Sequence, residues 1–199
     1  MAISLPDDSF SALIFDCDGT LVDTAPAHLR ALQHALDPLA LTMTPEWYYP
    51  RVGLAPDALL DEFDALLPGA APSRDDLFAR YNLAFERGLH SIKEIDVIAE
   101  IARDWYGRVP MAVASNGRRQ NVEATLRVTN LLPLFDCVIA SDDVLRGKPE
   151  PDVFLEAARR MKVEADRCVV FEDSSEGLEA AHRAGMRGID IRAFYTPQR

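Results

Sequence analysis

A short apolar run followed at once by two acids is the feature that most constrains this chain. Residues 12–15 are Ala, Leu, Ile and Phe, a pattern that predicts a buried strand. Directly after this run come Asp16, Asp18 and a turn at Gly19. In open α/β folds, the residues that follow a strand lie at the carboxyl edge of the sheet, where ligands bind. We therefore expect Asp16 and Asp18 to form a carboxylate pair at such an edge.

Two carboxylates this close repel each other, so a cation, a proton or a set of hydrogen-bond donors must offset their charge. Three later segments supply polar groups that can reach the same edge: Ser115-Asn116-Gly117, Gly147-Lys148-Pro149 and Glu172-Asp173-Ser174. Each has an ordinary structural interpretation, as a turn, a helix cap, a surface lysine or an acidic helix start. Only the ordered set makes a functional site the better interpretation.

Together these segments resemble the four motifs of the haloacid dehalogenase superfamily of phosphohydrolases. The chain carries the Asp-x-Asp-Gly-Thr motif at residues 16–20, the strand-ending Ser at 115, the Lys at 148 and the terminal acidic pair at 172–173. The similarity is greatest to the sugar-phosphatase and β-phosphoglucomutase branch, and within it to fructose-1-phosphatase-like proteins. The resemblance implies an α/β fold, with a Rossmann-like three-layer parallel-sheet core and an inserted small helical cap domain.

The resemblance also implies a role for each motif residue. Asp16 would be the nucleophile that forms an aspartyl-phosphate, and Asp18 would be the general acid and base. The expected catalytic residues are Asp16, Asp18, Ser115 and Lys148. The expected ligands of the substrate in the core are Thr20, Ser115, Lys148 and the backbone amides of Asn116 and Gly117. The expected metal ligands are Asp16, Glu172, Asp173 and the backbone carbonyl of Asp18, an oxygen-only set that suits Mg²⁺ as cofactor.

The hydrophobic period changes after Thr24 and predicts how the chain is organised. Helical spacing over residues 25–36, 56–66 and 73–89 predicts an all-helical cap domain over residues 25–91, with hinges at 23–24 and 91–94. Residues 1–24 and 92–199 would form the core. In the second part of the core, helical patterns alternate with predicted strands at 111–114, 137–140, 169–171 and 188–191, which indicates a parallel sheet.

Two residues of the predicted cap are candidate substrate ligands. His28 matches, by its offset from Asp16, a histidine that in the mutase assists acid and base chemistry. A half-buried helix residue is an equally good interpretation of His28. Gly53 matches a glycine of the cap's specificity loop.

The same region favours a phosphatase over a mutase. The mutase carries an Arg three residues after the loop glycine, where this chain has Pro56, and a cap lysine of relatives falls at Asn82. Arg51 and Arg80 lie close in sequence and could substitute for these phosphate anchors. A mutase needs a second anion pocket to hold a bisphosphate, and we expect that pocket to be poor here. Thr20 and Asn116 also replace apolar residues of the mutase.

We therefore predict a Mg²⁺-dependent phosphatase that hydrolyses a small phosphate monoester, with a sugar phosphate as the expected class. A β-phosphoglucomutase-type mutase is the alternative. A phospho-accepting signalling domain is a third hypothesis, because it also gathers acids, a Ser or Thr and a Lys at a sheet edge. Such domains run to about 120 residues and lack a helical insertion after the first strand.

Composition and charge limit the classes of partner that we expect for this chain. The formal net charge of −11 and the lack of a basic stripe exclude nucleic-acid backbone as an expected partner. No uninterrupted apolar run reaches the roughly 18 residues of a membrane span, and the first residues lack a signal-peptide pattern. Three irregularly spaced cysteines argue against a disulfide framework. We expect a cytoplasmic monomer whose partner is a small phosphate ester.

Overall fold

The structure, a computed structural model, describes residues 10–54, 56–66 and 73–195. The chain divides into two compact units, one built from Met1–Asp23 and Lys93–Gln198 and the other from Thr24–Ile92. Within the described residues, no helix combines the length and the apolar character needed to cross a membrane. The assignment of the second unit as a substrate-covering cap stays a prediction.

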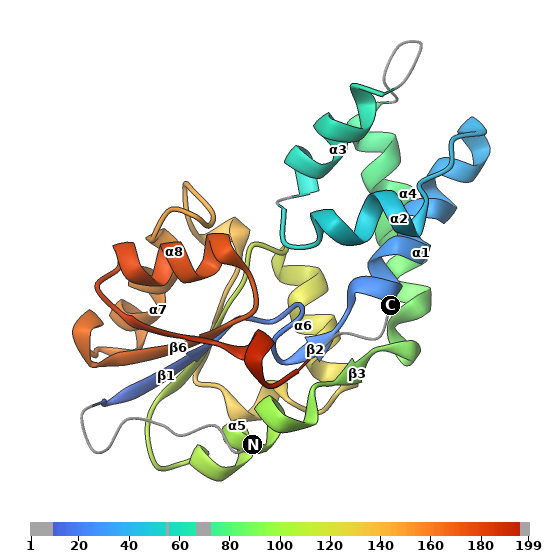
Figure 1. The fold of residues 1–199 in the computed structure, drawn as a ribbon. Helices are drawn as coiled ribbons and strands as arrows, with labels where there is room; N and C mark the ends of the chain where they lie inside the picture. The colour runs from blue at the N-terminus through green and yellow to red at the C-terminus, as the bar shows by residue number, and fades with distance from the viewer. Residues whose placement is uncertain (1–9, 55, 67–72, 196–199) are drawn as a thin grey trace. The chain divides into compact units, whose positions relative to one another are not determined.

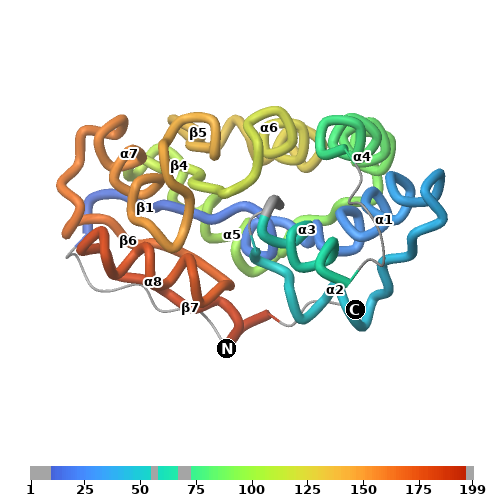
Figure 2. The backbone as a smooth tube through the Cα atoms, turned by 90° about the horizontal axis from the view of Figure 1, so that it is seen from above, coloured from blue at the N-terminus to red at the C-terminus, as the bar shows by residue number. Residues whose placement is uncertain are grey.

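A five-stranded parallel sheet organises the first unit. Its order is β5-β4-β1-β6-β7, with β1 at the centre (Figure 2). Each neighbouring pair is parallel, and the register at the centre joins Ile14 to Ala112 on one side and to Val170 on the other. The strands are β1 (Ala12–Phe15), β4 (Met111–Ala114), β5 (Cys137–Ile139), β6 (Cys168–Glu172) and β7 (Arg187–Asp190). The predicted α/β class with a parallel-sheet core is confirmed.

Helices connect these strands and cover the sheet (Figure 1). They are α5 (Asp96–Trp105), α6 (Arg119–Val128), α7 (Asp152–Met161) and α8 (Ser175–Arg183). The chain moves outward from β1 to β4 and β5, then crosses back to β6 and β7. Right-handed crossovers therefore place α5 and α6 on one face of the sheet and α7 and α8 on the other. Ala12 and Ile14 pack with Phe154 of α7 and Ala180 of α8 in one buried apolar cluster.

Two very short strands lie where the chain leaves and re-enters the first unit. Strand β2 (Val22–Asp23) pairs antiparallel with β3 (Lys93–Glu94), and the Ile95 amide donates to the Leu21 carbonyl at 2.8 Å. Residues 23–24 and 91–94 were predicted only as hinges. Two-residue strands are too short to carry a recognisable alternation, so their pairing could not be predicted from the pattern.

The second unit is helical, with its own buried core of Leu32, Leu36, Leu60, Phe63 and Leu77 among others. Its helices are α1 (Ala25–Leu36), α2 (Pro45–Tyr48), α3 (Pro56–Asp64) and α4 (Arg74–Gly88). Three of them were predicted to within two residues at each end. Helix α2 was missed, although Thr44 as N-cap and Pro45 in the first turn are recognised start signals. The side chain of Pro56 lies outside the described residues.

Single-turn 3-10 helices complete the described secondary structure of both units. They are η1 (Asp37–Leu39), η2 (Tyr49–Arg51), η3 (Leu89–Ser91), η4 (Leu132–Leu134), η5 (Ser141–Asp143), η6 (Ala165–Arg167) and η7 (Ile191–Ala193). Such short pieces are common at helix ends and as connections. The loop between η5 and α7 carries Lys148, so this predicted site residue sits on irregular backbone.

Candidate active site

A buried lysine joins two acids from neighbouring strands. Lys148 Nζ donates to Asp16 Oδ1 at 2.6 Å and to Glu172 Oε1 at 2.8 Å, and all three side chains are at least nine-tenths buried. Asp16 follows β1 and Glu172 ends β6, which pair side by side in the sheet. Burial alone would lower the pKa of Lys148, but the two carboxylates outweigh it and raise that pKa. Lys148 is therefore a fixed cation at the carboxyl edge.

A third acid leaves this cluster with surplus negative charge. Asp16, Glu172 and Asp173 each bring an oxygen within 4.8 Å of the others. Burial raises the pKa of Asp16 well above its usual range, and the neighbouring acids raise it further against the opposing effect of Lys148. Burial and then Glu172 raise the pKa of Asp173 to about 7. One lysine does not balance three ionised carboxylates, and these three acids could hold a metal ion.

The donor atoms of this cluster fit Mg²⁺. All the ligand atoms offered by Asp16, Glu172 and Asp173 are carboxylate oxygens, which hard divalent cations prefer. Burial, followed by the charge of Glu172, raises the pKa of Asp173, and a bound cation would favour its ionised form. The Asp18 carbonyl as a further ligand stays a prediction.

The Gly19-Thr20 turn holds Asp173. Gly19 has φ +89°, and a Cβ at this position would lie 2.2 Å from Asp173 Oδ2. Only glycine allows this close approach without strain. Thr20 was predicted to bind substrate. Its side chain is fully buried, and its hydroxyl donates to Asp173 Oδ1 at 3.1 Å, so Thr20 orients this carboxylate. Substrate contact by Thr20 stays a prediction.

Glu172 is held by the start of the helix that follows it. Ser174 donates to Glu172 Oε2 from its amide at 2.6 Å and from its hydroxyl at 2.9 Å. The Ser174 hydroxyl also accepts from the Gly177 amide at 3.0 Å, as an N-cap of α8. A Cβ on Gly177 would lie 1.8 Å from Glu172 Oε1. The segment with Ser174 was predicted to reach this edge and to allow a helix start, but the roles of Ser174 and Gly177 in holding Glu172 were not predicted.

Asp18, the second acid of the Asp-x-Asp motif, lies beside Ser115, which follows β4. Ser115 Oγ lies 3.5 Å from Asp18 Oδ2, at the long limit of a hydrogen bond. The Gly117 amide was predicted to bind phosphate. In this structure the amide donates to Ser115 Oγ at 2.9 Å, because the chain turns sharply after the strand, and its contact with phosphate stays a prediction. A phosphate oxygen would have to compete with Ser115 for this donor.

Asn116 was predicted to bind phosphate through its backbone amide, and this stays a prediction. Its side chain forms hydrogen bonds to Lys148. The amide group bonds to both backbone polar atoms of Lys148. The six predicted residues Asp16, Asp18, Ser115, Lys148, Glu172 and Asp173 are thus brought together at one edge of the sheet. The structure assigns no role by itself, and the catalytic roles stay predictions.

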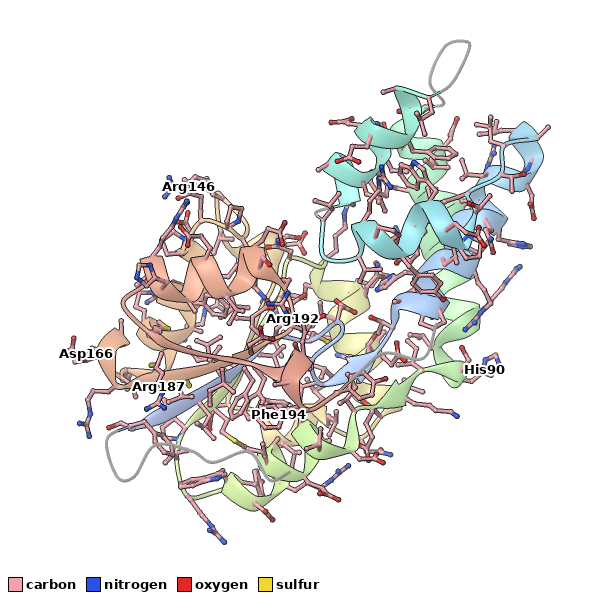
Figure 3. The ribbon with its side chains drawn as sticks, in the orientation of Figure 1. His90, Arg146, Asp166, Arg187, Arg192 and Phe194 are labelled. Atoms are coloured by element: carbon pink, nitrogen blue, oxygen red, sulfur yellow. The ribbon has the colours of Figure 1, made fainter. Side chains whose placement is uncertain are left out.

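Arg192 is a charged neighbour of the acid cluster that sequence reasoning missed. It follows β7 at the same edge of the sheet (Figure 3) and forms two hydrogen bonds to the carboxylate of Asp190, of 2.8 and 2.6 Å. The bond to Asp190 raises the pKa of Arg192, and Asp173 and Glu172 are close enough to raise it further. No motif marks this position, because its closeness to the acids depends on strand order.

The two predicted ligands in the helical unit have their own surroundings. His28 on α1 stacks on Phe85 of α4, with ring centroids 4.5 Å apart, and its Nδ1 lies 2.5 Å from the Tyr81 hydroxyl. Gly53 has φ +105° in the turn before α3. The half-buried helical position that was the alternative for His28 is observed. Substrate contact by His28 or Gly53 stays a prediction.

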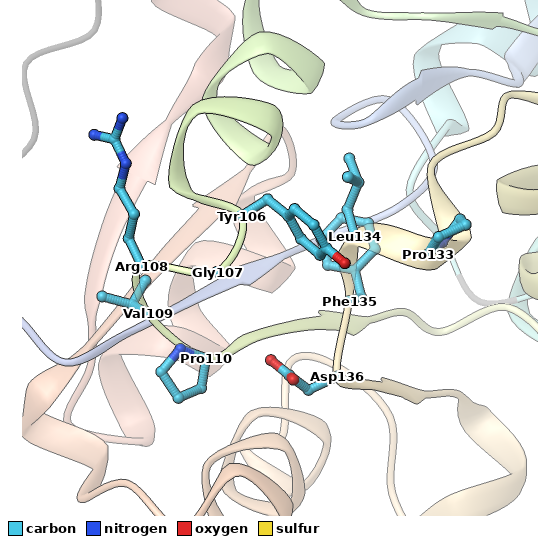
Figure 4. A pocket seen from close by; sticks show the side chains of 9 residues that line it. All are labelled: Tyr106, Gly107, Arg108, Val109, Pro110, Pro133, Leu134, Phe135 and Asp136. Atoms are coloured by element: carbon cyan, nitrogen blue, oxygen red, sulfur yellow. The ribbon is translucent and has the colours of Figure 1, made fainter.

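One cavity lies at the other end of the sheet (Figure 4). Its volume is about 420 Å³, and it is lined by residues that precede β4 and β5, among them Tyr106, Arg108, Phe135 and Asp136. Strand direction puts these residues at the amino edge of the sheet, opposite the acid cluster. Asp136 Oδ2 already accepts from the Met111 amide at 2.8 Å. The cavity is therefore separate from the acids and Lys148.

Comparison with known proteins finds a hydrolase family and phosphatases among the similar sequences. The sequence profile of the haloacid dehalogenase-like hydrolases matches residues 13–191. Fructose-1-phosphate phosphatase YqaB of Escherichia coli is 34% identical over 195 residues, which cover 93% of this chain and 98% of that protein. A phosphorylated carbohydrates phosphatase of Thermotoga maritima is 29% identical over 189 residues, covering 89% of this chain and 83% of that protein.

A solved structure of similar fold covers most of this chain. The crystal structure of CbbY from Rhodobacter sphaeroides in complex with phosphate superposes with a TM-score of 0.82 at 29% identity, covering 90% of this chain and 84% of that chain. The match extends across most of both chains, so it includes the sheet and its helices.

Proposed function

This chain belongs to the haloacid dehalogenase-like hydrolase family, and on that basis we propose that it is a Mg²⁺-dependent phosphatase of a small sugar phosphate. The observation that carries the proposal is the buried contact of Lys148 Nζ with Asp16 Oδ1, at 2.6 Å, inside a cluster of acids. A carboxylate nucleophile needs such a cation, because it must approach a phosphate that is itself negatively charged.

The side chains support a two-step reaction through an aspartyl-phosphate. In the first step an Asp16 oxygen bonds to phosphorus, the ester P–O bond breaks, and Asp18 donates a proton to the departing alkoxide. In the second step Asp18, now ionised, takes a proton from water while that water bonds to phosphorus and the Asp16–phosphorus bond breaks. The products are the alcohol and inorganic phosphate, and both aspartates return to their starting states.

Other residues hold the reacting groups. Lys148 offsets the charge of Asp16 and of the bound phosphate, and Ser115 is positioned beside Asp18 to bind a phosphoryl oxygen. Asp16, Glu172 and Asp173 would hold Mg²⁺. The ion would supply further positive charge to the phosphate while it is transferred.

The substrate class rests on relatives. The Escherichia coli relative is named for fructose 1-phosphate, and the Thermotoga maritima relative for phosphorylated carbohydrates. Both support a sugar phosphate as the substrate of this chain. Action in the cytoplasm and a monomeric state are also our predictions. The free thiols of Cys17, Cys137 and Cys168 agree with a reducing compartment.

The test is a panel of phosphate esters, with released inorganic phosphate measured with and without Mg²⁺. The panel includes fructose 1-phosphate, phosphoglycolate and β-glucose 1-phosphate. We expect Mg²⁺-dependent release, fastest with a sugar phosphate. Conversion of β-glucose 1-phosphate to the 6-phosphate without release would instead identify a mutase. A lack of turnover, with labelling only by a phosphoryl donor, would favour the signalling hypothesis.

A stability measurement tests the metal site separately. Asp173→Asn removes one charge from the acid cluster and keeps the Oδ1 acceptor for Thr20. We expect a higher Tm for the metal-free variant than for the metal-free wild type, and no further rise on adding Mg²⁺. The difference should be several degrees, since about 1 kcal/mol moves Tm by roughly 2–4 °C in a protein of this size. An equal Mg²⁺-dependent rise in both proteins would place the ion elsewhere.

A further inference from the structure

Both backbone polar groups of Lys148 are bound by one side chain. Asn116 Oδ1 accepts from the Lys148 amide at 2.8 Å, and Asn116 Nδ2 donates to the Lys148 carbonyl at 3.2 Å. An amide side chain is suited to this pairing because it carries a donor and an acceptor at once. The two bonds fix the position and the orientation of the Lys148 backbone.

These two hydrogen bonds, called the clamp from here on, hold a residue that lies outside every helix and strand. Lys148 lies in the loop between η5 and α7, where no helix or strand ladder holds its backbone. Asn116 instead follows β4, which is paired with β1 on one side and β5 on the other. The amide therefore ties a loop residue to a rigid part of the sheet. Asp16 follows β1, the neighbour of β4. Both partners of the 2.6 Å ion pair are therefore held by the same parallel sheet.

Gly147 leaves the space that the clamp occupies. A Cβ on Gly147 would lie 2.6 Å from Asn116 Oδ1 and 3.1 Å from its Cγ. Real Cβ atoms essentially never approach another heavy atom to 2.6 Å, so an alanine here would push the amide away. Gly147 is not among the glycines with positive φ, so an alanine adds no backbone strain of that kind. The cost of Gly147→Ala falls on the Asn116 contact.

We propose that Asn116 is a positioning residue that sets the distance of Lys148 Nζ from Asp16 and Glu172, and that Gly147 is required for it to do so. This inference rests on the proposed function for its kinetic consequence only. The Asn116 side chain bonds to the backbone of Lys148 and not to Asp16 or Asp18. It acts through the lysine, whose displacement by about 1 Å would lower the rate of phosphoryl transfer by on the order of 100-fold.

The first test measures the lysine itself and needs no substrate. The chain has three lysines, and Lys93 and Lys162 are exposed while Lys148 is buried. Brief acetylation with acetic anhydride, followed by peptide mass spectrometry, compares the three within one sample. We expect Lys148 to react far more slowly than the two exposed lysines in the wild type. Asn116→Ala and Gly147→Ala should each speed its modification at least several-fold, without faster modification of the exposed pair.

The second test is kinetic. Asn116→Ala should lower kcat by roughly 10- to 100-fold, with a smaller change in KM, because the misplaced lysine fails mainly during transfer. Gly147→Ala should have a similar effect alone and no added effect in an Asn116→Ala background, where the amide it displaces is gone. Gly88→Ala is the matched control, since a Cβ there meets no atom within 4 Å. It should leave kcat and Lys148 labelling unchanged.

The outcomes separate this inference from the proposed function. Unchanged Lys148 labelling in both folded single variants would overturn the clamp, whatever the activity. Fully additive kcat losses in the double variant would also overturn it, because independent effects need no shared contact. Faster Lys148 labelling with no turnover of any ester by the wild type would support the clamp and contradict the phosphatase.

Discussion

We expect Asp16→Asn to abolish phosphate release while the protein stays folded. The amide has nearly the size of the carboxylate but cannot act as a nucleophile toward phosphorus, so kcat should fall by on the order of 10⁴-fold or more. The substitution also removes one of three crowded charges, and Lys148 keeps its 2.8 Å bond to Glu172. The Tm should therefore equal or exceed that of the wild type. Phosphate release and circular dichroism measure the two effects.

A matched control separates the role of Asp16 from a general effect of removing an acid. Asp104 is exposed on α5, so Asp104→Asn should change neither Tm nor turnover. Mass spectrometry of the wild type quenched during turnover should detect a phosphoryl adduct on the peptide that carries Asp16. A folded Asp16→Asn variant that keeps wild-type activity would refute the nucleophile assignment.

The second large effect is expected for Lys148→Met, which should lower both the free energy of unfolding and kcat. The side chain that replaces it is apolar and of similar length, so Asp16 and Glu172 would be left buried without their cation. Breaking a buried ion pair by removing one partner costs about 3–5 kcal/mol. Loss of a charge that stabilises the transition state costs about 100- to 1,000-fold in kcat. Urea unfolding and phosphate release measure the two losses.

Two comparisons make this result specific to the ion pairs. Lys162→Met alters an exposed lysine and should leave both quantities near the wild-type values. Adding Glu172→Gln to Lys148→Met removes one of the stranded charges and should recover part of the unfolding free energy without recovering activity. If Lys148→Met unfolds at the wild-type urea concentration, the buried charges do not depend on this lysine.

The sheet and its acidic edge could be predicted from the sequence because both follow from local patterns. Four apolar runs, at residues 12–15, 111–114, 137–140 and 169–171, coincide with β1, β4, β5 and β6 to within one residue at each end. Polar residues placed directly after such runs must lie at one edge once the strands are parallel. This is why the sequence alone predicts that Asp16, Ser115 and Glu172 lie close together.

The contacts that orient these side chains could not be predicted in the same way. Thr20 bonds to Asp173 across 153 residues of sequence, and Lys148 reaches Asp16 across 132. Which donor meets which acceptor depends on strand order and on fractions of an ångström in the loops. The hydrogen bonds of Thr20 to Asp173 and of the Gly117 amide to Ser115 could therefore not be predicted, and binding of substrate by these two residues stays a prediction.

In the helical unit, the helices could be predicted from the sequence but the function of His28 could not. Its three longer helices follow from apolar residues at helical spacing, and their ends from Pro and Gly. The function of His28 does not follow from that spacing, because stacking on Phe85 serves a packing role as well as a chemical one. Residues 55 and 67–72 lie outside the described part of this unit.

The pairing of β2 with β3 has a consequence for how such a protein can change over evolutionary time. Asp23 and Lys93 are direct partners, so the chain leaves the sheet-containing unit and returns to it at adjacent points. A segment inserted between adjacent points need not alter the distances that the rest of the fold depends on. Recombination can therefore lengthen, shorten or replace the whole intervening segment in one event, while the parallel sheet and its cluster of acids are inherited intact.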